Sequence, residues 1–219
     1  MEDISLSYPV KPYKLIQGFG LNPEYYAKFL DVNGNPEKGH MGLDLQAYHG
    51  QPVYAPCDGD AFYTQDKHGG DGIYIRWPNN ASTRYNVILW HLCSKDDPQF
   101  KPLIKCDGSI TPVKEGDLLA FADNSGAPYE SSGDHLHLGL LPTDSTGGPL
   151  YPGNGYGGTI DPEPFLNGKY AQDKDLPVSP ETPSPPLTED IKQRKIWIIE
   201  QLIYWLKELY KKVVQPSSQ

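Results

Sequence analysis

The stretch that decides the fold reads GDHLHLGL and runs from Gly133 to Leu140. Its histidines and leucines alternate, as expected for a β-strand, in which successive side chains point to opposite faces of the sheet. His135 and His137 then share one face, and the leucines share the other. We expect a half-buried strand whose apolar face anchors it in a core, while its two imidazoles serve a metal ion or a proton relay.

A second stretch with the same alternation reads HMGLDL and runs from His40 to Leu45. Its polar face would carry His40 and Asp44, with Gly42 between them. Because Gly42 has no side chain, we expect room for a metal ion at this point. A fourth histidine, His91, ends an apolar run and would face a cleft from the end of its own strand.

Composition predicts a mainly β protein. A chain of 219 residues has room for one well-buried domain and an appendage. The 22 glycines and 22 prolines favour many turns between short strands. The formal charge of −9 argues against a phosphate-binding surface, so we expect no nucleic-acid partner.

Turn residues and apolar runs divide the chain into strand pairs. We expect one pair over residues 50–56 and 58–63, a second over 73–77 and 85–91, and a hairpin-like unit over 113–121. Asn22 followed by Pro23 predicts the cap and first position of a helical turn.

The domain organisation follows from a change in composition after Tyr170. We expect a folded domain over residues 1–170, a Pro-rich linker over 171–187, an amphipathic helix over 188–214 and a tail over 215–219. The apolar stripe of this helix would be buried against a second copy of itself, the parent domain, a docking partner or a membrane surface.

The cysteines and the N-terminal residues indicate less about the fold and the function. Cys57, Cys93 and Cys106 cannot all pair within one chain. Free, partly buried thiols are expected ahead of a Cys93–Cys106 disulfide. The first residues show no signal peptide, and no apolar run reaches the length of about 18 residues that a transmembrane segment needs.

The histidines and the aspartate together predict a zinc site. Catalytic zinc commonly has three protein ligands and one open position, and imidazole and carboxylate are frequent ligands. His40 and Asp44 would supply two ligands, and His137 would complete the set from another strand. A purely structural zinc site would favour four closed ligands and more cysteine.

With these motifs in order, the sequence resembles the lysostaphin-type (LytM-like) zinc metalloendopeptidases, which are peptidoglycan hydrolases. The matching pieces extend over about residues 8–166 and comprise QGFG at 17–20, HMGLD at 40–44, PVYAP at 52–56, WHL at 90–92, VKEGD at 113–117 and HLHL at 135–138. The resemblance implies a compact antiparallel β-sheet or sandwich of the duplicated-hybrid-motif kind, with a groove.

The resemblance also implies residue roles. His40, Asp44 and His137 would bind zinc, while His91 and His135 would be the catalytic histidines beside the metal-bound water. Which of the two is the base stays open. Independently of the resemblance, Tyr25 or Tyr26, which stand shortly before His40 in the sequence, would add a donor to the oxyanion or contact the substrate. The substrate would be a peptide cross-link of bacterial peptidoglycan, either a glycine bridge or a stem-peptide link.

Other functions stay open at this point. A catalytically silent family member would bind the cell wall or a partner hydrolase as a regulatory module, and a scaffold would act through the C-terminal helix. Because silent members typically lose ligands, the full set favours an enzyme. A protein that acts on the cell wall without a leader would be associated with a phage particle or exported by another route.

Overall fold

The computed structural model describes residues 4–67, 69–77 and 84–173. All of them belong to the first of the two units into which the chain divides, Met1–Asp175. The described part is mainly β, as predicted. Beyond residue 173, the predicted linker, the helix over 188–214 and the tail lie outside the described residues.

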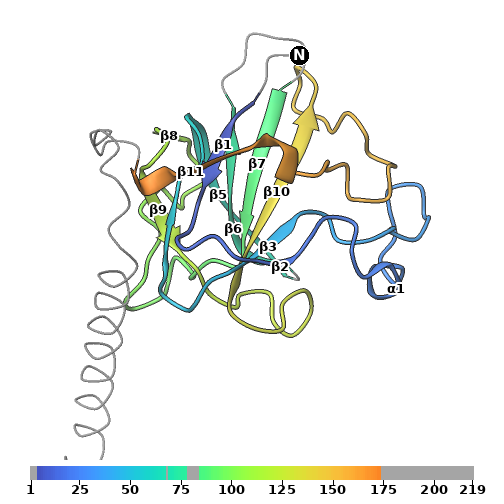
Figure 1. Cartoon of the computed structure of the whole chain (residues 1–219), viewed down its shortest axis with the longest axis horizontal. Coiled ribbons are helices and arrows are strands. Elements are labelled where there is room, and N and C mark those ends of the chain that lie inside the picture. Colours follow the sequence, from blue (N-terminus) through green and yellow to red (C-terminus); the bar gives the residue numbers. More distant parts are fainter. Residues whose placement is uncertain (1–3, 68, 78–83, 174–219) are drawn as a thin grey trace, which may run out of the picture. The chain divides into compact units, whose positions relative to one another are not determined.

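The largest element is a seven-stranded sheet in which all neighbouring strands are antiparallel (Figure 1). Its order is β2 (Leu15–Gln17), β3 (Leu43–Gln46), β10 (His135–Thr143), β7 (Arg84–Trp90), β6 (Gly70–Arg76), β5 (Gly59–Asp66) and β8 (Thr111–Val113). The strand that contains the HLHL motif thus lies inside the sheet, between β3 and β7.

Two small sheets complete the fold. β4 (Pro52–Tyr54) pairs antiparallel with β9 (Leu118–Phe121), and β1 (Leu6–Tyr8) pairs parallel with β11 (Leu166–Tyr170). Residues of β1, β4 and β9 join residues of the large sheet in one hydrophobic core. The arrangement is therefore the expected sandwich-like packing of sheets, with one parallel pair that the sequence did not predict.

The described helical elements are short. They are α1 (Pro23–Tyr26) and the 3₁₀ turns η1 (Glu163–Phe165) and η2 (Ala171–Asp173). Asn22 precedes α1 as predicted, but its side chain donates to Gln17 Oε1 and makes no cap hydrogen bond. Within the described residues, no helix has the length and apolar character needed to cross a membrane.

The leucine face of β10 is the anchor of the large sheet. Leu136, Leu138 and Leu140 are all fully buried. At about 1.5–3 kcal/mol for each fully buried side chain, they fix which face of the strand points inward. The register then places His137 opposite Asp44 on β3 and opposite Trp90 on β7.

Two predicted hairpins are wrong. β4 and β5 do not pair with each other, and neither do β8 and β9; instead β4 pairs with β9, and β5 with β6 and β8. Turn residues mark where a strand ends, but partner choice depends on burial: Val53 and Ala61 are both fully buried, each in a different sheet. The predicted pairing of β6 with β7 is confirmed.

The strand predicted from His40 to Leu45 is shorter than expected, because β3 begins at Leu43. The backbone of His40 pairs with the loop after β2: Gly20 N donates to His40 O at 2.8 Å, and His40 N donates to Leu21 O at 3.0 Å. His40 therefore lies in the loop before β3 and not on the strand itself.

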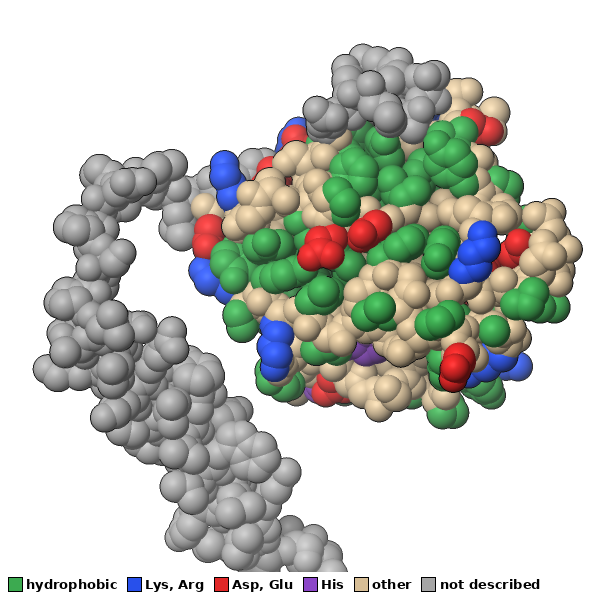
Figure 2. Space-filling view, turned by 45° about the vertical axis from the view of Figure 1, so that its right-hand side comes forward, with side chains coloured by type: hydrophobic (Ala, Val, Ile, Leu, Met, Phe, Trp, Pro, Cys, Tyr) green, Lys and Arg blue, Asp and Glu red, His purple; other side chains and the backbone are tan. Residues whose placement is uncertain are grey.

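On the face shown in Figure 2, the Lys and Arg side chains lie apart from one another and form no basic patch, while hydrophobic side chains gather near the centre.

Candidate metal centre

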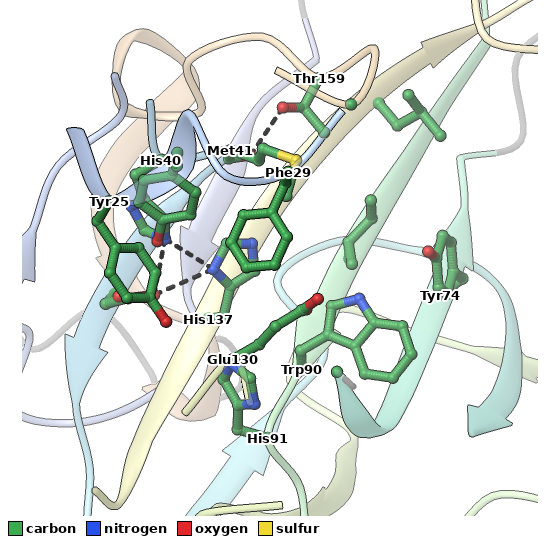
Figure 3. Close-up of a pocket in the computed structure, with 16 residues that line it drawn as sticks. Tyr25, Phe29, His40, Met41, Tyr74, Trp90, His91, Glu130, His137 and Thr159 are labelled. Atoms are coloured by element: carbon green, nitrogen blue, oxygen red, sulfur yellow. Dashed lines mark hydrogen bonds and ion pairs between the residues drawn. The ribbon is translucent and has the colours of Figure 1, made fainter. Parts of the chain in front are cut away.

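Three side chains converge on one point where β3 pairs with β10 (Figure 3). His40 Nε2 lies 3.0 Å from His137 Nδ1 and 3.1 Å from Asp44 Oδ1, and His137 Nδ1 lies 3.0 Å from the same oxygen. The three atoms form a nearly equilateral triangle. The predicted ligands His40, Asp44 and His137 are thus brought together by a loop, β3 and β10.

The protonation of these groups suits a cation. His40 Nδ1 lies 3.2 Å from Gly18 O, and since a carbonyl only accepts, this nitrogen carries the proton and Nε2 presents a lone pair. Burial lowers the pKa of His137, which keeps its imidazole neutral. Burial alone would raise the pKa of Asp44, but contacts with His137 and His40 outweigh it and hold that pKa well below its usual range. Two imidazole nitrogens and one carboxylate oxygen are ligands that fit a divalent ion such as zinc.

Gly42 is necessary for this arrangement, although for a different reason than the sequence suggested. A Cβ at this position would lie 2.5 Å from Leu138 O and 2.7 Å from His137 Nε2. The room expected for a metal ion is therefore occupied by the ring of His137, which packs over Gly42.

His91 and His135 lie beside the triangle. Their ring centroids are 4.5 Å apart, and His135 Nε2 lies 3.6 Å from Asp44 Oδ1. His91 Nδ1 donates to Ser125 O and His135 Nδ1 to Gly133 O, each at 2.7 Å. Both rings are thus oriented through Nδ1, which leaves Nε2 able to accept a proton.

His91 is unusual in both its ring and its backbone. Burial, followed by the neighbouring His137 and His135, lowers its pKa to about 3, so the ring is neutral at neutral pH. Its φ of 66° lies in the left-handed region, which costs a residue other than glycine about 1–3 kcal/mol. Strain of this kind is concentrated at functional sites, and here it turns the chain directly after β7.

The two candidate tyrosines are distinguished by their hydroxyl groups. Tyr25 OH donates to Tyr129 O at 3.1 Å, whereas Tyr26 OH accepts from Gln17 Nε2 at 3.0 Å and keeps its own proton available. Burial and the nearby Asp44 raise the pKa of Tyr26, so it remains a neutral donor. Its ring centroid lies 5.6 Å from that of His40. Tyr26 is therefore the better placed of the two.

A pocket opens directly over the ligand triangle, and most of its wall was not predicted. Besides the histidines, its lining includes Phe29, Met41, Tyr74, Trp90 and Glu130 (Figure 3). Trp90 pairs with Gly72 on β6, where a Cβ would lie 2.5 Å from the indole, so the glycine leaves room for the tryptophan.

A comparison with protein families finds no matching family model, and a comparison with curated proteins finds no match. Among solved structures, the chain is similar to a zinc-containing peptidase from Vibrio cholerae, with 29% identity and a TM-score of 0.44 over 65% of this chain. It spans 39% of the length of that peptidase.

Two other solved structures show a comparable similarity. One is LytU, with 24% identity and a TM-score of 0.45 over 71% of this chain and 85% of LytU. The other is a mutant catalytic domain of the prophage-encoded M23 protein EnpA from Enterococcus faecalis, with 19% identity and a TM-score of 0.46 over 72% and 95%.

Proposed function

We propose that this chain is a zinc-dependent endopeptidase of the lysostaphin type that hydrolyses peptide cross-links of peptidoglycan in the bacterial cell wall. The observation that supports it most is the convergence of His40 Nε2, Asp44 Oδ1 and His137 Nδ1 within 3.1 Å. Two further histidines beside them have their Nδ1 atoms committed to backbone carbonyls. Ligands and proton acceptors therefore occur side by side.

His40, Asp44 and His137 would hold the zinc ion. When bound, zinc polarises a carbonyl and lowers the pKa of water to about 7, which makes hydroxide available at neutral pH. His91 and His135 each present Nε2 as a proton acceptor. One of them would take the proton of the attacking water and later give it to the leaving amine.

Tyr26 would stabilise the negative charge that develops on the scissile carbonyl. Its neutral hydroxyl lies in the same pocket lining as His40 and His137. Removing one such donor costs about 10²–10³ in kcat in known cases. We expect Tyr26→Phe to lower kcat with little change in KM, and Tyr25→Phe, whose hydroxyl contacts Tyr129 O, to have a smaller effect.

The pocket suits a peptide. Phe29, Tyr74 and Trp90 offer apolar and aromatic wall, and Glu130 adds negative charge that would favour an amine of the substrate.

The test compares zinc content and release of soluble peptide from purified cell walls. Wild type should bind zinc at this site and solubilise wall, while His137→Ala and Asp44→Asn should each bind less zinc than wild type, because the ion at this site is lost, and should release no peptide. Asp96→Asn is the matched control, because the side chain of Asp96 is 78% exposed and lies outside the site. A wild type without zinc, or a His137→Ala variant that solubilises wall like wild type, would overturn the proposal.

The same assay separates the alternative of a catalytically silent module. A wild type that binds zinc and sediments with cell wall but releases no peptide would identify the chain as a binding or regulatory protein. Mass spectrometry of the new peptide ends would distinguish a glycine bridge from a stem-peptide link.

A further inference from the structure

A second group of side chains converges outside the proposed active site. His49 Nδ1 lies 2.8 Å from Asp123 Oδ1 and 3.9 Å from Cys93 Sγ. The three residues come from the loops after β3, β7 and β9, which are tied together by backbone bonds such as Cys93 N to Phe121 O at 2.8 Å. None of them is shared with the triangle of His40, Asp44 and His137.

The geometry excludes a nucleophilic relay of cysteine, histidine and aspartate. In such a relay, the imidazole contacts the nucleophile through one ring nitrogen and the carboxylate through the other. Here both Cys93 Sγ and Asp123 Oδ1 approach the same atom, His49 Nδ1. Instead, one potential ligand atom from each of the three residues lies within 4.8 Å of the other two.

The environment of Cys93 also argues against a redox role. The residue is fully buried, and burial together with Asp123 raises the pKa of its thiol to about 12. A buried thiol with a raised pKa is a poor nucleophile and is slow to oxidise. In contrast, His49 and Asp123 are partly exposed, with 48% and 29% of their side chains accessible, so an ion could enter from solvent.

We propose that His49, Cys93 and Asp123 form a second metal site, selective for a divalent ion that accepts sulfur ligands, such as zinc. Imidazole nitrogen, thiolate sulfur and carboxylate oxygen are the three ligand types of zinc proteins. Binding breaks the S–H bond of Cys93, forms a metal–sulfur bond and releases the proton to solvent. Asp134, whose Oδ2 accepts from His49 N at 3.1 Å, or a water molecule would fill a fourth position.

An ion in the second site would stabilise the positions of the two candidate catalytic histidines. Asp123 N donates to His91 O at 2.8 Å, and His135 N donates to Asp123 O at 3.3 Å. The backbone of Asp123 is thus hydrogen-bonded to both His91 and His135. An ion that holds the Asp123 side chain would therefore also hold this backbone, and with it the positions of both histidines. This consequence rests on the proposed function, whereas the binding of the ion does not.

Zinc stoichiometry of the full chain tests the proposal first. Elemental analysis should find two zinc ions per wild-type chain and one in His49→Gln, whose half-exposed side chain can be replaced without disturbing the core. His137→Ala should also retain one, because it removes only the first site. One zinc in both wild type and His49→Gln would overturn the proposal.

Cobalt provides a readout specific to the thiolate. The Co²⁺-loaded full chain should show a near-ultraviolet charge-transfer band from sulfur to cobalt, and the band should persist in His137→Ala. It should be lost in Cys93→Ser and retained in Cys106→Ser, a control at a half-buried free thiol. A missing band in wild type, or a band that survives Cys93→Ser, would refute the site. Since the band in His137→Ala does not depend on the first site, the two proposals can fail separately.

Discussion

His91 links the burial of one imidazole to the stability of the whole domain. Its pKa is about 3 in the folded protein because the ring is desolvated, whereas a histidine in an unfolded chain has a pKa of about 6.5. Between these pH values the unfolded state binds more protons, so the free energy of unfolding falls as the pH falls, by up to about 1.4 kcal/mol per pH unit.

Urea unfolding of metal-free protein from pH 7 to pH 4 checks this expectation. Wild type should lose stability steadily toward acid, and His91→Gln, which has no such proton to bind, should show a flatter profile. Parallel profiles for the two proteins would contradict the assigned direction of the pKa shift.

Gly42 is the second residue whose replacement has a defined outcome. An alanine there would place a methyl group 2.5 Å from a backbone carbonyl and 2.7 Å from the ring of His137. Because backbone cannot move aside cheaply, we expect Gly42→Ala to destabilise the protein by about 1–3 kcal/mol and to lower zinc affinity.

Gly133→Ala is the matched control, since nothing lies within 4 Å of a Cβ at that position. Urea unfolding and equilibrium dialysis against zinc would measure both effects. Equal stability and zinc affinity in the two variants would mean that the ring of His137 does not need the space above Gly42.

At the scale of elements, the leucine face of β10 holds the site in place. Leu138 is fully buried and lies next to His137 on the same strand. We expect Leu138→Ala to cost about 2–5 kcal/mol in the free energy of unfolding. Leu103→Ala, at a residue that is 59% exposed, should change it by less than about 0.5 kcal/mol. Chemical denaturation of both variants would show whether the difference is this large.

How much the sequence could predict depends on the element. The alternation over 133–140 predicted β10 and its buried face, because every second side chain of a strand lies on the same face and the apolar residues show which face is buried. The apolar runs likewise predicted β6 and β7 as partners, which the structure confirms.

Contacts that depend on distant residues could not be predicted. The hairpins expected at β4–β5 and β8–β9 are wrong because the two strands of each expected pair belong to different sheets. His40 was expected on a strand, but the loop around Gly20 holds it. The sequence left open whether Trp90 and the tyrosines belong to the core or to a substrate groove, because Phe29, Tyr74 and Trp90 meet only after the sheet has formed.

At the scale of the molecule, the candidate metal centre and the hydrophobic core around it lie within residues 4–173. A chain that ends at Asp175 should therefore bind zinc as the full chain does, with the same urea midpoint. A chain that ends at Asp161 lacks β11 and uncovers β1, including the fully buried Leu6, so it should unfold at lower urea.

Loss of zinc binding in the chain that ends at Asp175 would show that residues 176–219 contribute to the site. Sedimentation of this chain beside the full chain also tests the predicted self-association of the helix over 188–214. If both chains sediment as monomers at micromolar concentration, the prediction of self-association is wrong.

The parallel pairing of β1 with β11 has a mechanical consequence. The two strands lie near opposite ends of the described chain, and a pull on both ends would drag them in opposite directions along their common axis. Their hydrogen bonds would be loaded in shear, all at once, rather than opened one after another. Under tension, the lifetime of the domain would then be set by the rate at which this one strand pair slips, which optical-tweezer pulling on wild type and on a β11-deleted chain can measure.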